Sequence, residues 1–120
     1  MLTATGCQRA SRTASVDQAP DIAAALAFDP DPATVGPASL TLTLQDVNGA
    51  PVAGATVSLK GDMSHAGMQP VLADAAETAG GVYRAQWVWT MAGDWAVTAT
   101  ATLPDGRTML RRFDLAVSRP

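Results

Sequence analysis

The chain has little of what conventional enzymes and disulfide-rich secreted domains use. It contains one cysteine and one histidine, so no intrachain disulfide can form and no Cys or His pair stands at the spacing of a zinc site. A glycine-rich phosphate-binding loop is also missing from the sequence. We therefore expect neither hydrolase nor transferase chemistry, and we predict that the protein is not an enzyme.

Basic residues are scarce as well. Eight Lys and Arg against eleven Asp and Glu give a formal net charge of −3, without the basic stripe that nucleic acid or an anionic membrane attracts. No stretch approaches the roughly 18 consecutive apolar residues of a membrane span. We expect a soluble domain without a nucleic-acid partner, and 120 residues of which 48% are hydrophobic suffice for one domain with its own core.

The N-terminal segment differs in character from the rest. Met1 to Cys7 resembles the end of a bacterial lipoprotein signal, in which small residues precede a cysteine that is lipidated. The basic region and most of the apolar region of such a signal are missing before Leu2, and the alternative is an ordinary cysteine in a tail. Residues 8–20 are rich in Ser, Thr, Ala, Gln and Arg without periodicity, which is typical of a flexible linker. We predict a signal remnant and linker over residues 1–20 and a folded domain over residues 21–120.

Within the folded part, apolar and polar residues alternate with a period of two, the pattern of half-buried strands. The predicted strands cover residues 39–46, 55–60, 71–77, 82–90 and 95–103. A last strand is predicted to begin at Met109 and to carry Phe113, Leu115 and Val117 on one face. A first strand is predicted around Ile22, Leu26 and Phe28, although the alanines between them would also suit a helix.

Turn residues separate these segments at regular intervals. The pairs Asn48-Gly49, Gly80-Gly81 and Asp105-Gly106 supply the backbone angles that tight connections need. Residues 40–57 resemble a hairpin common in bacterial immunoglobulin-like domains. We predict an all-β fold, an immunoglobulin-like antiparallel β-sandwich of about seven strands.

One loop stands out chemically, because the histidine lies between two methionines in Met63-Ser64-His65-Ala66-Gly67-Met68. The loop follows a predicted strand that ends near Gly61. If consecutive strands run antiparallel, that strand and the one ending near Thr90 finish at the same end of the sandwich. Met91 would then lie beside the loop, whereas Met109 would lie at the opposite end.

Two or three thioethers with one imidazole suit a soft ion, because thioether sulfur binds Mg²⁺ and Ca²⁺ poorly and selects copper(I). Methionine has no proton to lose, so binding at acidic pH requires only that the imidazole be neutral. We predict a copper(I) site, for which silver(I) is a mimic, formed by Met63, His65, Met68 and Met91.

These residues also have ordinary structural explanations. Methionine often fills gaps at the end of a core, and a lone histidine beside glycine is commonly a solvated turn residue. The tryptophans lie on the apolar faces of their strands, so Trp87, Trp89 and Trp95 are expected in the core. Trp89 or Trp95 could still cover a bound cation with its ring.

Other charged residues suggest no reaction. An enzyme would need a cleft with perturbed acids around Asp62, Asp74 or Asp94, and the spacing of these residues does not suggest one. Arg111 and Arg112 are interpreted as surface charge and receive no role.

Three short motifs of the sequence occur together: Met63 to Met68, Gly81-Val82-Tyr83, and Met91-Ala92-Gly93-Asp94-Trp95 followed by Val97-Thr98-Ala99-Thr100. Together they resemble the YtkA-like family, related to FixH, of small exported bacterial proteins. The resemblance covers about residues 38–117. It implies an immunoglobulin-like β-sandwich outside the cytoplasm, often beside copper efflux or oxidase-assembly components. The recurrent features of the family fall on Met63, His65, Met68, Met91 and Trp95, whereas the membrane helix of FixH proteins has no counterpart in this sequence.

We therefore expect a periplasmic or membrane-tethered copper(I)-binding protein, a copper chaperone or copper-resistance accessory that performs no catalysis. Its expected partner is a copper efflux or oxidase-assembly protein, and it would contact the outer surface of a bacterial membrane only through a lipid on Cys7. The alternative is a non-catalytic structural or protein-interaction module of an exported lipoprotein.

Overall fold

The computed structural model describes residues 19–63 and 69–120, and these residues form seven strands and no helix. The strands are β2 (Ala23–Asp29), β3 (Gly36–Gln45), β4 (Thr56–Met63), β5 (Val71–Ala79), β6 (Val82–Trp89), β7 (Gly93–Thr102) and β8 (Thr108–Val117). All strand pairs are antiparallel. In this part of the chain, no helix is long and apolar enough to cross a membrane. The predicted first strand is confirmed as β2, and β5 runs two residues beyond its predicted end.

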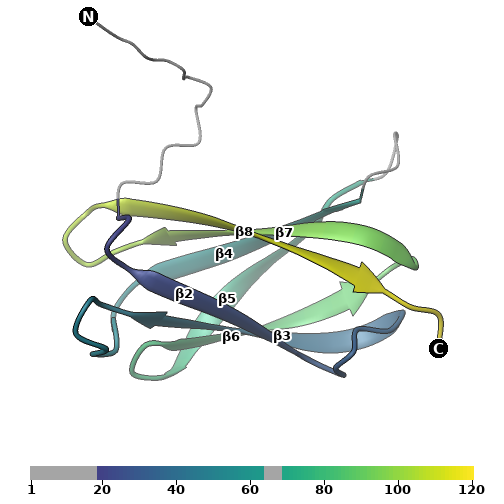
Figure 1. The fold of residues 1–120 in the computed structure, drawn as a ribbon, viewed down its shortest axis with the longest axis horizontal. Coiled ribbons are helices and arrows are strands. Elements are labelled where there is room, and N and C mark those ends of the chain that lie inside the picture. The colour runs from purple at the N-terminus through teal and green to yellow at the C-terminus, as the bar shows by residue number, and fades with distance from the viewer. Residues whose placement is uncertain (1–18, 64–68) are drawn as a thin grey trace, which may run out of the picture.

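The strands form a continuous hydrogen-bonded sheet in the order β2-β3-β6-β5-β4-β7-β8. Figure 1 shows β4, β7 and β8 together at the top of the view and β3 and β6 together at the bottom. β5 joins these two layers, because Val71–Ala75 pair with β4 while Ala76, Glu77 and Ala79 pair with β6. With the strands lettered A to G in chain order, the layers are ABED and CFG, the arrangement of immunoglobulin constant-type domains. The predicted fold class is confirmed.

Alternating side chains from both layers build the core. Leu40, Leu42 and Leu44 of β3 are fully buried, and each such leucine contributes about 1.5 to 3 kcal/mol of hydrophobic stabilisation. The inward residues of β6 and β7 that complete the core are Tyr83, Ala85, Trp87, Trp89, Trp95, Val97, Ala99 and Ala101. The period-two patterns of these strands therefore predict the buried face correctly.

Tyr83 fastens the connection between β3 and β4 to the core. Its hydroxyl donates a hydrogen bond to the carbonyl of Val52 at 2.6 Å and accepts one from the amide of Ala55 at 3.1 Å. The Glu77 carboxylate accepts from the amide of Gly54 at 3.2 Å in the same connection. Burial raises the pKa of Tyr83 above its ordinary value of 10.0, and the nearby negative charge of Glu77 raises this pKa as well.

The start of the folded part is held by Arg111. Its guanidinium donates hydrogen bonds to the carbonyls of Ala19 at 3.0 Å and Ile22 at 2.6 Å. The interpretation of Arg111 as surface charge without a role is therefore wrong, because the side chain is partly buried and links the chain before β2 to β8. Ala19 is itself fully buried, so packing begins two residues before the predicted boundary at Asp21.

We expect Tyr83→Phe to lower the free energy of unfolding by about 1 to 3 kcal/mol, because it leaves the Val52 carbonyl and the Ala55 amide without their hydroxyl partner. Urea unfolding followed by tryptophan fluorescence measures this difference. An unchanged unfolding midpoint would show that the hydroxyl bonds do not stabilise the connection.

The raised pKa of Tyr83 also predicts alkaline destabilisation. The unfolded chain loses the tyrosine proton near pH 10 and the folded chain only at higher pH, so this group leaves stability unchanged at neutral pH and lowers it as pH rises above 10. Since the chain has a single tyrosine, tyrosinate absorbance in the folded protein reports Tyr83 alone. The absorbance should rise at higher pH in folded than in urea-unfolded protein, and coincident curves would contradict the prediction.

Candidate metal centre

Strand register brings Met63 and Met91 to the same end of the sandwich. Met63 is the last residue of β4 and is the register partner of Trp95 in β7. Met91 lies in the turn between β6 and β7, four residues before Trp95. This arrangement agrees with the prediction, made from alternating strand directions, that the β4 and β6 strands finish at one end.

The turn that carries Met91 is closed by a tryptophan side chain. The indole Nε1–H of Trp95 donates a hydrogen bond to the carbonyl oxygen of Met91 at 2.9 Å. Gly93, between them, has a φ of +138°, a backbone angle that residues other than glycine rarely adopt. The Met-x-Gly-x-Trp pattern thus has a structural meaning, since its glycine permits the turn and its tryptophan closes it.

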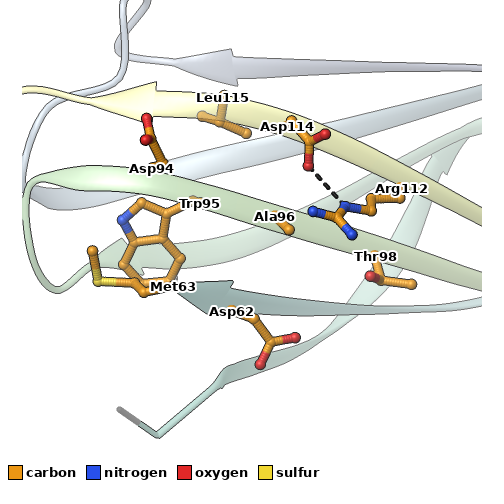
Figure 2. A pocket seen from close by; sticks show the side chains of 9 residues that line it. All are labelled: Asp62, Met63, Asp94, Trp95, Ala96, Thr98, Arg112, Asp114 and Leu115. Atoms are coloured by element: carbon orange, nitrogen blue, oxygen red, sulfur yellow. Dashed lines mark hydrogen bonds and ion pairs between the residues drawn. The ribbon is translucent and has the colours of Figure 1, made fainter. Parts of the chain in front are cut away.

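Gly93 also makes room for Met63. A Cβ at position 93 would lie 2.9 Å from the Cε methyl of Met63, inside van der Waals contact. Figure 2 shows the Met63 side chain beside the Trp95 ring, at the end of β4. Met63 is half-buried and packs against the core, whereas Met91 is 39% exposed.

The tryptophans form a chain of contacts beneath these methionines. Trp87 and Trp89 lie edge to face with ring centroids 5.7 Å apart, and Trp89 and Trp95 lie edge to face at 5.2 Å. All three are at most 3% exposed, which confirms the expectation that they belong to the core. The prediction that Trp89 or Trp95 covers a cation stays a prediction.

Gly61 is a site-forming residue that the sequence analysis treated as the end of a strand. It lies inside β4, which continues to Met63. A Cβ on Gly61 would stand 2.6 Å from Cζ2 of Trp87 and 3.2 Å from Cε3 of Trp95, so the glycine lets both rings approach the β4 backbone. A glycine inside a strand signals such a close approach, and this signal could have identified Gly61 from the sequence.

A hollow of about 520 Å³ lies beside Met63 and Trp95, over β4, β7 and β8 (Figure 2). The carboxylates of Asp62, Asp94 and Asp114 line it. The guanidinium of Arg112 binds the Asp114 carboxylate at 2.8 Å, which leaves the lining with a net negative charge. In the described ranges, no group of three His, Cys, Asp or Glu side chains is arranged to hold a metal ion.

The structure describes two of the four predicted metal ligands, Met63 and Met91. Met63 and Met91 share one end of the sandwich, and Met109 is fully buried beside Ala101, toward the other end. The predicted ligands His65 and Met68, and the predicted lipidation site Cys7, lie outside the described residues.

A family model described as YtkA-like matches residues 17–100. The chain belongs to the YtkA-like family. The match spans the described residues from Ala19 through most of β7, including Met63 and the Met91–Trp95 turn. No curated protein sequence matches this YtkA-like chain.

Solved structures share the fold of this YtkA-like domain at low sequence identity. The PmoD soluble domain from a Methylocystis species has a TM-score of 0.52 at 12% identity, covering 81% of this chain and 90% of that one. An engineered protein has a TM-score of 0.53 at 16% identity, and the match covers 95% of this chain and 21% of the engineered one. Murine CRIg aligns with a TM-score of 0.45 at 14% identity, over 82% of this chain and 98% of that one. For the PmoD domain and the engineered protein, the likeness at these identities concerns the fold alone.

We expect Gly61→Ala to destabilise the YtkA-like domain by about 1 to 3 kcal/mol, because the added methyl group collides with the Trp87 ring. Gly80→Ala is the matched control, since a Cβ there meets nothing within 4 Å, and its effect should stay within about 0.5 kcal/mol. Chemical denaturation of both variants measures the difference. Equal stabilities would show that the rings do not depend on the glycine.

Proposed function

We propose that this YtkA-like domain binds copper(I) through Met63, His65, Met68 and Met91, outside the cytoplasm and without catalysing a reaction. The observation that carries the proposal is that Trp95 links two methionines from separate parts of the chain: Met63 at the end of β4 is its register partner, and Met91 in the β6–β7 turn accepts its indole hydrogen bond through the backbone carbonyl. The resemblance of the loop and turn motifs to the family supports the same function.

The donor set favours a soft, monovalent ion. Thioether sulfur is a neutral, polarizable ligand that selects copper(I) over hard cations. It carries no proton, so the affinity would depend on pH through the imidazole of His65 alone.

The two placed thioethers differ in a way that suits holding and then releasing an ion. Met63 is half-buried and packs against the core, so it provides a donor of fixed position. Met91 is 39% exposed in a turn, where an incoming partner could reach it. A bound ion would thus have a fixed ligand on one side and an accessible ligand on the other, as a copper chaperone or copper-resistance accessory requires.

The cellular setting of the proposal comes from the family resemblance. It suggests an exported protein that exchanges copper with an efflux or oxidase-assembly component. A lipid on Cys7 would tether the domain to the outer face of a bacterial membrane.

One observation favours a second function, a protein-interaction module. Leu72 of β5 is 70% exposed and Val88 of β6 is 48% exposed, and exposed apolar side chains can contribute to a protein-interaction surface. Both lie toward the Met63 end, since Leu72 is the register partner of Lys60 and Val88 that of Pro37. Binding of a partner protein at this end requires no metal.

A titration with copper(I) against a competing chromophoric chelator separates the two functions. We expect one equivalent to bind tightly to the full chain. Met63→Leu, His65→Ala, Met68→Leu and Met91→Leu should each weaken binding by at least about tenfold, because each removes one ligand.

Met109→Leu is the control for these variants. It replaces a thioether by a side chain of similar volume at a fully buried position toward the other end of the domain, so the copper affinity should stay unchanged. If the wild-type protein does not compete for copper(I), the copper proposal fails and the interaction module is the better account.

A further inference from the structure

Trp95 interacts with both Met63 and Met91, although it has no atom that would bind the ion as a ligand. We propose that Trp95 is the positioning residue of the copper site, which holds Met91 through its indole N–H and Met63 through its ring. This inference rests on the proposed function. It assigns Trp95 a different task from covering the ion with its ring.

The hydrogen bond to Met91 is specific to this tryptophan. Trp87, Trp89 and Trp95 are all buried, yet in the described part of the chain the indole nitrogens of Trp87 and Trp89 have no hydrogen-bond partner. Trp95 instead donates to the Met91 carbonyl at 2.9 Å. Met91 lies between β6 and β7 with 39% of its surface exposed, so core packing does little to hold it and the indole bond fixes its backbone.

The ring of Trp95 acts on Met63 by packing. The two residues are register partners on β7 and β4, and Figure 2 shows the thioether beside the indole. The Met63 methyl lies over Gly93, in a space that any Cβ there would fill. Met63 is thus held between the Trp95 ring and the backbone of the turn that the same indole closes.

Trp95 is in turn held rigidly. Its ring lies edge to face with Trp89 at 5.2 Å and close to the β4 backbone, since a Cβ at Gly61 would come within 3.2 Å of it. A ligand is held most precisely when its supporting residue is locked by packing and hydrogen bonds. Packing in the core therefore fixes the position of Trp95, and Trp95 in turn fixes the positions of Met63 and Met91.

The test uses the full chain with Trp95→Phe, Met91→Leu and the double variant in the copper(I) competition titration. We expect Trp95→Phe to weaken binding about tenfold, the scale of one lost hydrogen bond. Because Trp95 acts partly through Met91, the loss in the double variant should be clearly smaller than the product of the two single losses. Losses that multiply would show that Trp95 acts independently of Met91 and would overturn the proposal.

Trp87→Phe is the matched control. It also shrinks a buried indole in the same ring cluster but removes no hydrogen bond to a described residue. Its copper affinity should fall by clearly less than that of Trp95→Phe, because the Met91 carbonyl keeps its indole donor. An equal loss in Trp87→Phe and Trp95→Phe would show that general core packing, and not positioning by Trp95, sets the affinity.

A second measurement needs no copper and so separates this inference from the proposed function. In the metal-free protein with labelled methionine methyl groups, Trp95→Phe should move the Met63 and Met91 methyl resonances toward random-coil positions and leave Met109 unchanged. Unmoved Met63 and Met91 signals would refute positioning. If only the wild-type copper titration fails, the proposed function fails while this result still decides the role of Trp95.

The wild-type protein provides a readout that does not require any variant to fold. Hydrogen exchange of the three indole N–H groups should be slowest for Trp95 if its bond to the Met91 carbonyl persists in solution. Fast exchange at Trp95, with protection at Trp87 and Trp89, would show that the bond does not persist and would overturn the proposal.

Discussion

The close approach of two tryptophan rings to the β4 backbone at Gly61 is the constraint on which one end of this domain depends. A methyl group at that position would overlap the Trp87 ring and crowd the Trp95 ring. Because no side chain separates them from the strand, the edge-to-face chain from Trp87 through Trp89 to Trp95 fits beneath it. The position of Trp95 then decides where the β6–β7 turn closes and where Met63 packs.

The two ends of the sandwich are stabilised by different means. At the end away from Met63, polar groups fasten the connections: Tyr83 and Glu77 hold the β3–β4 connection, and Arg107 binds both Asp21 at 3.0 Å and Asp105 at 2.9 Å. At the Met63 end, aromatic packing and the Trp95 indole hydrogen bond contribute, together with backbone hydrogen bonds that join Val35 and Ala33 to Ser118. Both ends of the sandwich are therefore fixed, by different interactions.

Much of the fold follows from local sequence patterns. The alternation in β3, β6 and β7 predicts their buried faces, and the rule that consecutive strands run antiparallel is enough to bring Met91 to the end where β4 finishes. The pairing of β5 could not be predicted, because its alanine-rich pattern does not indicate that the strand changes its partner from β4 to β6 between Ala75 and Ala76. That change depends on the positions of β4 and β6, which the strand's own sequence does not contain.

The site was predicted less completely, for reasons that particular residues make clear. Gly61 was predicted only as the end of a strand, because the rings that need its small size come from β6 and β7. Arg111 resembles a surface charge, because its acceptors are backbone carbonyls of Ala19 and Ile22, which carry no sequence signature. The acceptor of the Trp95 indole hydrogen bond is likewise a backbone carbonyl, that of Met91. The Met-x-Gly-x-Trp motif could therefore be recognised in the sequence, but the hydrogen bond that explains it could not. His65 and Met68 stay predictions from the sequence.

Anomalous diffraction from a crystal of the copper(I)-loaded protein is the decisive measurement for the proposed copper site, because a map at the copper edge locates the ion without assuming its ligands. We expect one strong peak within bonding distance of the sulfur atoms of Met63 and Met91, beside Trp95. A peak among the carboxylates of Asp62, Asp94 and Asp114, a peak near Met109, or no peak in the loaded crystal would contradict it.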